Sequence, residues 1–97
     1  MGLLSLPSLK MTNSELASVI GSVTGLVTVL SFIPQAVRVW KTKRTQDLSV
    51  GTFSMLVAQA AGWTTYGLLL EQAPIVWTNL GVLVLTLVIL GAKLRHG

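Results

Sequence analysis

Three long stretches without a charged residue constrain the fold of this chain more than any other feature. They span residues 16–37, 48–70 and 72–92. A helix needs about 20 apolar residues to cross the hydrocarbon core of a bilayer, and each stretch reaches that length. Only 10% of the residues are charged, whereas about a quarter are charged in a soluble domain. The sequence therefore predicts an all-α integral membrane protein, a bundle of three transmembrane helices. We expect these helices at roughly residues 15–41, 48–70 and 74–95.

The residues before the first helix, 1–14, are expected to form a short leader outside the membrane. Residues 15–97 then form a single domain. Met11 offers an alternative start of the chain, which would make residues 1–10 an extension. The first helix does not resemble a cleaved signal peptide, because its apolar stretch is too long and a basic cluster follows it.

Local signals mark the start of each predicted helix. Thr12 and Glu15 have the spacing of a capping box. Asp47 or Ser49 can cap the second helix, and Pro74 suits the first turn of the third. Because the connections are short, we expect helices that are neighbours in the sequence to be antiparallel.

The basic residues gather on one side of the predicted bundle. Four of them follow the first charge-free stretch and two follow the third: Arg38, Lys41, Lys43, Arg44, Lys93 and Arg95. The second connection carries one acid, Glu71, and no basic residue. Since basic residues favour the cytoplasmic side, we expect the N-terminus outside and the C-terminus in the cytoplasm.

The composition excludes several kinds of site. There is no cysteine, so disulfides and thiolate metal sites are excluded, and His96 is the only histidine. We expect no metal and no cofactor, and we find no ATP-binding motif. The polar residues offer no nucleophile and base for an enzyme. The net charge of +4 does not indicate nucleic-acid binding, because the basic residues lie at helix ends.

Pro34 and Gln35 lie inside the first predicted helix. A proline there removes one backbone hydrogen bond and clashes with the carbonyl four residues earlier, here that of Leu30. In hydrocarbon the freed carbonyl needs a neighbouring helix, a polar side chain or water. A proline followed by an amide therefore predicts a hinge beside a polar, hydrated path, which a simple membrane anchor does not need.

Polar side chains within the helices are costly in a membrane and need an explanation. Serine and threonine hydroxyls can bond to their own helix, so each alone is uninformative. Asn79 differs, because its amide has two donors and two lone pairs that its own helix cannot satisfy. One interpretation is a hydrogen bond between helices, and the other is a binding site.

Trp63 favours the binding site. It lies roughly 10 Å inside the outer end of the second helix, and Asn79 lies roughly 7 Å inside the third, at 1.5 Å per residue. The two side chains can therefore meet. An indole packs on the apolar face of a pyranose ring while a carboxamide bonds its hydroxyls, so the pair suits a sugar. Trp40 and Trp77 lie near helix ends, where we expect interface anchors.

Small residues spaced by four predict close helix contacts. Gly21 and Gly25 have this spacing in the first helix, and Ala58 and Gly62 in the second. Such spacing lets two helix backbones approach.

Four motifs together resemble the bacterial SemiSWEET sugar transporters of the PQ-loop (MtN3/saliva) family. They are SFIPQ at 31–35, TKRTQDLS at 42–49, WTTYG at 63–67 and P-x-x-x-x-N at 74–79. The resemblance covers about residues 15–95. It implies a three-helix half-transporter that works as a parallel homodimer in the bacterial inner membrane. This agrees with the residues themselves, since three helices cannot enclose a sugar-sized path.

The resemblance also implies roles for single residues. Trp63 and Asn79 match the sugar contacts, and Pro34 with Gln35 matches the hinge. Tyr66 matches a residue of the outer gate. In some relatives its partners are an arginine four residues later and an aspartate six later, where this chain has Leu70 and Gln72. The charged outer gate is therefore absent. The remaining candidates, for an inner gate or equally for core packing, are Phe53 and Met55.

We therefore expect a passive, bidirectional carrier of a mono- or disaccharide that works by alternating access. No Asp or Glu lies within the three charge-free stretches, so the usual proton relay is missing. The expected partners are the sugar, membrane lipid and a second copy of the chain, with no nucleic acid. The alternatives are a PQ-loop carrier of another small solute and a structural subunit of a membrane complex.

Overall fold

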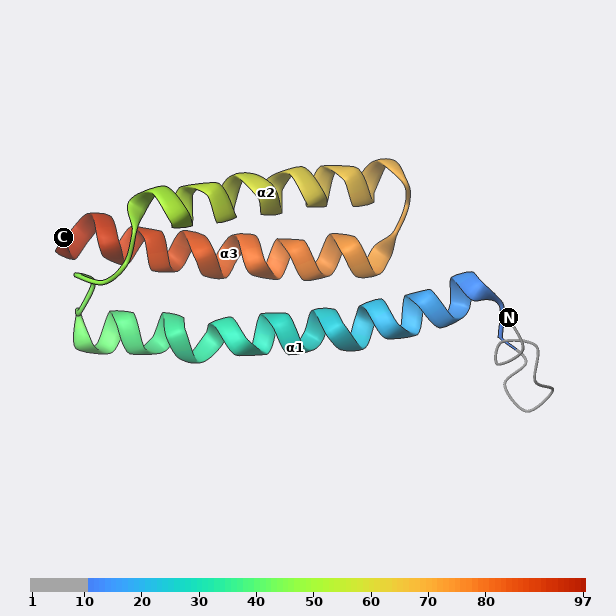
Figure 1. The fold of residues 1–97 in the computed structure, drawn as a ribbon, viewed down its shortest axis with the longest axis horizontal. Coiled ribbons are helices and arrows are strands. Elements are labelled where there is room, and N and C mark those ends of the chain that lie inside the picture. The colour runs from blue at the N-terminus through green and yellow to red at the C-terminus, as the bar shows by residue number, and fades with distance from the viewer. Residues whose placement is uncertain (1–10) are drawn as a thin grey trace.

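The computed structural model describes residues 11–97, which form three helices (Figure 1). These are α1 (Asn13–Thr42), α2 (Val50–Leu69) and α3 (Ala73–His96). The predicted all-α, three-helix fold is confirmed. Of the predicted leader, residues 1–10 lie outside the described residues, whereas Asn13 and Ser14 already belong to the first turn of α1.

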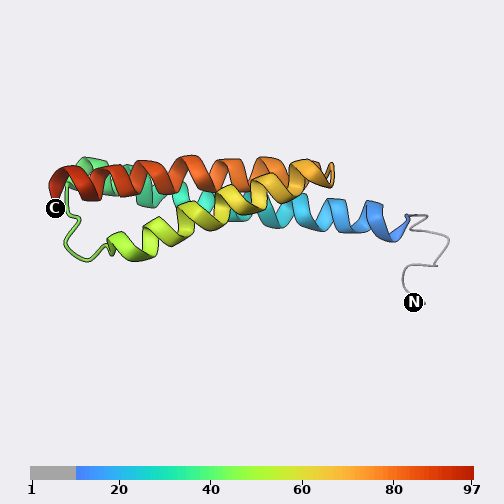
Figure 2. The ribbon, with the colours of Figure 1, turned by 90° about the horizontal axis from the view of Figure 1, so that it is seen from above.

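Helix α3 is the centre of the bundle. It packs against both α1 and α2, which have few contacts with each other, and it lies between them in Figure 1. Of the helices that follow each other in the sequence, α2 and α3 therefore pack together, whereas α1 and α2 do not. The connection after α1 instead crosses the end of α3, which leaves α1 and α3 side by side and parallel (Figure 1). Figure 2 shows that α2 is inclined to α3 and diverges from it toward the start of α2.

Glycines set the close approach of α1 and α3. A Cβ added at Gly25 would overlap the Oγ1 of Thr78 and lie 2.9 Å from its Cβ. The same addition at Gly21 would lie 3.6 Å from the Cβ of Pro74, an ordinary contact. The small-residue spacing in α1 therefore marks a helix contact, as predicted. At Gly62 an added Cβ would meet nothing within 4 Å, so the spacing in α2 marks no contact within the chain.

The helix starts follow the local sequence signals. Thr12 and Glu15 form the capping box: the Glu15 N–H donates to Thr12 Oγ1 at 3.1 Å and the Thr12 N–H to Glu15 Oε1 at 3.4 Å. Of the two candidates for the cap of α2, the structure selects Ser49, whose Oγ accepts from the Thr52 N–H at 3.1 Å. Pro74 lies in the first turn of α3.

The apolar side chains of the bundle face outward. Within residues 11–97, α1 and α3 are the helices long and apolar enough to cross a membrane, and only 6% and 22% of their most apolar windows is buried. The core helix of a soluble domain would bury most of that surface. Helix α2 is less apolar because it carries glycines, threonines and a glutamine, several of which line the grooves described below.

Two long side chains join α1 and the first connection to the C-terminal half of α3. The Trp40 indole N–H donates to the carbonyl of Val88 at 2.9 Å, so this predicted interface anchor also joins α1 to α3. The Lys93 ammonium donates to the carbonyl of Thr45 at 2.9 Å. That bond holds the first connection, in which Thr45 is 1% exposed, against α3.

Candidate functional site

Helix α2 presents an aromatic surface that its own chain leaves uncovered. Trp63 and Tyr66 are 49% and 48% exposed, and their rings meet edge to face at 5.2 Å and 84°. This is a favourable geometry for an aromatic pair. The adjacent side of the helix, with Ala60, Thr64 and Gly67, is buried. The pair lines a groove of about 360 Å³ together with Gln59 and Gly62.

Gln59 extends this surface toward the start of α2. It also lines a second groove, of about 430 Å³, with Thr52, Met55 and Leu56. Met55 is 73% exposed, whereas Phe53 is half-buried. The two candidates for an inner gate therefore have different surroundings. Gln59 was not among the predicted site residues, although its spacing of four from both Met55 and Trp63 places it on their face of the helix.

Asn79 lines a groove between α1 and α3. The groove has a volume of about 200 Å³, and its polar lining consists of Thr24, Thr28, Thr78 and Asn79. The Asn79 Nδ2 donates to the carbonyl of Ile75 at 2.8 Å, a bond within its own helix. Within residues 11–97 no hydrogen bond joins Asn79 to another helix, and its Oδ1 has no donor. Its own helix therefore satisfies one donor of this amide, and the acceptor remains free for a ligand.

Trp63 and Asn79 line different grooves of the single chain. Trp63 belongs to the exposed face of α2 and Asn79 to the groove between α1 and α3. Their meeting in one pocket therefore stays a prediction.

Pro34 lies within α1, which continues through it as a helix. Two hydroxyls in the preceding turns bond to backbone carbonyls: Thr28 Oγ1 to Thr24 at 3.0 Å and Ser31 Oγ to Thr28 at 2.7 Å. Bonds of this kind often bend a helix. The adjacent Gln35 is exposed and lines a groove of about 560 Å³ at the first connection. The other polar residues of that groove are Arg38, Thr42, Arg44 and Asp47.

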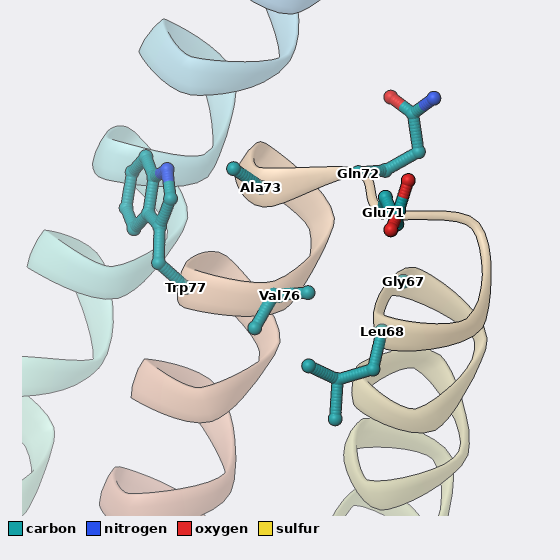
Figure 3. A pocket seen from close by; sticks show the side chains of 7 residues that line it. All are labelled: Gly67, Leu68, Glu71, Gln72, Ala73, Val76 and Trp77. Carbon is teal, nitrogen blue, oxygen red and sulfur yellow. The ribbon is translucent and has the colours of Figure 1, made fainter.

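The turn between α2 and α3 forms a mostly apolar groove of about 440 Å³ (Figure 3). Leu68, Val76 and Trp77 supply apolar side chains, while the polar ends of Glu71 and Gln72 lie at the turn. Glu71 has a φ of 55°, and the Gln72 N–H closes the turn on the carbonyl of Gly67 at 2.9 Å. Leu70, at a position where some relatives carry a gate charge, is 51% exposed.

No group of three or more metal-ligating side chains forms within residues 11–97. The grooves on α2 and between α1 and α3 are lined by aromatic, amide and hydroxyl groups without a charged residue. Such a set can stack on an apolar ring face and bond neutral hydroxyls, which is the chemistry of an uncharged polar solute.

Comparison with known proteins yields consistent matches. The profile of a family described as "Sugar efflux transporter for intercellular exchange" matches residues 15–92. A sugar transporter SemiSWEET of Bradyrhizobium diazoefficiens is 37% identical over 82 residues, which cover 84% of this chain and 95% of the relative. Another, of Leptospira biflexa, is 36% identical over 80 residues, 82% of this chain and 94% of the relative. The crystal structure of a bacterial homologue of SWEET transporters matches with a TM-score of 0.79 and 34% identity, over 84% of this chain and 99% of that one.

Proposed function

This chain belongs to the family of sugar efflux transporters, and we propose that it carries a mono- or disaccharide passively and in both directions across the bacterial inner membrane. The family is one of transporters rather than enzymes, as the sequence predicted. The observation that carries the proposal is the Trp63–Tyr66 pair of α2. Both side chains are about half exposed, and they line a groove with Gln59. An indole face and an amide, without a charge, suit a neutral sugar.

The proposed binding residues are Trp63 and Asn79. The Trp63 indole stacks on the C–H face of the ring, and the free Oδ1 of Asn79 accepts from a sugar hydroxyl. Since these residues line separate grooves of one chain, the pocket is completed by a second copy.

The working unit is a parallel homodimer whose two-fold axis runs along the membrane normal, as in other transporters built from parallel repeats. Two features support it. The grooves of a single chain are open, and Met55, Trp63 and Tyr66 expose large side chains on one face of α2. Parallel copies also place every basic cluster on the cytoplasmic side, with each N-terminus outside and each C-terminus inside.

The dimer predicts a definite mass in detergent. Light scattering of the purified protein, corrected for bound detergent, is expected to give twice the chain mass of 10.3 kDa. A mass of one chain, under conditions in which the protein carries sugar, would contradict the dimer.

Alternating access is proposed to use α1 as the bending element. Pro34 leaves the carbonyl of Leu30 without its helical donor, so α1 bends there at lower cost than elsewhere. Tyr66 closes the outer side, and Phe53 with Met55 closes the inner side. Because Leu70 and Gln72 carry no charge, the outer side closes by packing of Tyr66 and Leu70 rather than by an ion pair.

Passive carriage predicts equilibration without accumulation. In sealed proteoliposomes, labelled sugar is expected to reach the outside concentration and to stop there, with or without ionophores that collapse proton and sodium gradients. No acid lies in the interior of any helix to couple a proton. Accumulation above the outside concentration that an imposed proton or sodium gradient drives would contradict the passive mechanism.

A further inference from the structure

The groove at the turn between α2 and α3 lies on a side of these helices that the proposed sugar site does not use. Apolar side chains of both helices line it, Leu68 of α2 and Val76 with Trp77 of α3 (Figure 3). At about 100° per residue, Leu68 lies about 140° from Trp63 around α2. By the same rule Trp77 lies about 160° from Asn79 around α3. The groove is therefore open to the membrane when the sides of Trp63 and Asn79 face a second copy.

An exposed apolar surface of α3 continues the groove along the helix. We call it the α3 apolar stripe, and its spacings of three, four, three and seven residues keep it on one face. The helix rises about 26 Å over its length at 1.5 Å per residue, close to the hydrocarbon thickness of about 30 Å. Such a surface suits acyl chains, so the groove lies at one end of a face that lipid covers. The stripe consists of Trp77, Leu80, Val84, Leu87 and Leu94, which are 38–67% exposed.

The polar end of the groove carries a carboxylate, that of Glu71, which is exposed. The chain has no lysine or arginine between residues 45 and 92 that could neutralise it. Backbone bonds fix the turn: the Glu71 N–H donates to the carbonyl of Leu68 at 3.3 Å. The next N–H, of Gln72, donates to the carbonyl of Gly67 at 2.9 Å. A negative charge is therefore held at the turn, beside the apolar lining (Figure 3).

The groove has the polarity of a phospholipid, with charged and amide groups at one end and apolar groups at the other. Trp77 lies about 6 Å into α3 from Ala73, a depth at which an indole suits the boundary between headgroups and acyl chains. The Glu71 carboxylate only accepts hydrogen bonds, so it favours an ammonium with N–H donors. The amide of Gln72 can donate to a phosphate oxygen. A choline headgroup has no N–H donor, and the carboxylate repels a headgroup with net negative charge.

We infer that this groove binds a phospholipid with a primary ammonium headgroup, phosphatidylethanolamine. The ammonium lies on the carboxylate of Glu71, and one acyl chain lies in the groove and continues along the α3 apolar stripe. The inference rests on the proposed function in two respects: the orientation places the turn in the outer leaflet, and the dimer leaves this side of α2 and α3 uncovered. The lipid itself touches none of the proposed sugar-binding residues.

Competition between lipids tests the headgroup. The purified protein in detergent is offered equal amounts of phosphatidylethanolamine, phosphatidylcholine and phosphatidylglycerol with identical acyl chains, and native mass spectrometry counts the lipids bound. We expect the ethanolamine lipid to be retained about 2- to 5-fold more than the choline lipid, the factor of an exposed ion pair, and the glycerol lipid least. The first two differ only by three methyl groups on the nitrogen, so this comparison needs no variant. Equal retention of these two would overturn the inference.

Two substitutions separate the headgroup contact from the groove. Glu71→Gln keeps the size of the side chain and removes its charge, so the preference for ethanolamine is expected to disappear. Glu15→Gln is the matched control, because a glutamine preserves the capping box and Glu15 lines none of the grooves described above; the preference should stay native. Trp77→Ala is expected to lower the retention of all three lipids and to keep the preference.

A native preference in Glu71→Gln, or native retention in Trp77→Ala, would overturn the inference. Since bound lipid is counted and sugar exchange is not, these outcomes are independent of the proposed substrate. Lipid binding as expected in a protein that exchanges no sugar would overturn the proposed substrate alone.

Discussion

Replacing Trp63 by alanine is expected to reduce sugar exchange about 100-fold. The indole is 49% exposed in the single chain, so a stacked sugar ring would remove much of its remaining surface from water. Burial of a large apolar side chain contributes up to about 3 kcal/mol, and that energy corresponds to a factor of about 100 in binding. Initial rates of counterflow in proteoliposomes, at sugar concentrations below half-saturation, measure the loss.

Asn79→Leu is expected to cause a comparable loss, because it removes the only amide in the groove between α1 and α3 while keeping the side-chain volume. Trp77→Ala is the matched control for Trp63→Ala. It removes an indole that is 38% exposed from the groove of the outer turn (Figure 3), so exchange should remain close to native. Near-native exchange by Trp63→Ala, or an equal loss in Trp77→Ala with folding intact, would contradict the proposed sugar site.

Gly25→Ala is expected to destabilise the packing of α1 on α3. The new methyl would overlap Oγ1 of Thr78 and lie 2.9 Å from its Cβ, so α1 and α3 must separate. Overpacking of this kind costs about 1–3 kcal/mol. Thermal unfolding of the purified protein in detergent, followed by circular dichroism, measures the change.

Two further variants identify the cause of that loss. Gly21→Ala adds the same methyl one turn earlier, at an ordinary 3.6 Å from the Cβ of Pro74. It is expected to leave the free energy of unfolding within about 0.5 kcal/mol of the native value. Thr78→Ala removes the overlapping hydroxyl, so the double variant with Gly25→Ala should recover part of the lost stability, a positive coupling between neighbours. Equal effects of the two glycine substitutions would contradict the packing of α1 on α3.

The sequence predicted the helices well because long charge-free stretches have one stable solution in a membrane. It did not predict that α3 is central. Hydrophobic patterning marks which residues are apolar but not which helices pack together, and the length of a connection does not settle it. The spacing of Gly21 and Gly25 indicated a close contact but could not identify Thr78 on α3 as its partner.

Within the candidate site, the sequence identified the tryptophan and the asparagine but not the threonines. Trp63 was noticeable because tryptophan usually lies near helix ends at the interface, and Asn79 because an amide is costly inside a membrane. Thr24 and Thr28 were individually uninformative, and only the structure shows that they line the same groove as Asn79. The bond from Asn79 to the carbonyl of Ile75 depends on a side-chain rotamer, which no spacing rule supplies.

Counterflow of labelled glucose and sucrose tests the central claim most directly. Proteoliposomes loaded with unlabelled sugar and diluted into a trace of labelled sugar need no gradient of any other solute. We expect a transient accumulation of label for at least one of the two sugars with the native protein, and initial exchange about 100-fold slower with Trp63→Ala or Asn79→Leu. No exchange of either sugar by a folded native dimer would contradict it.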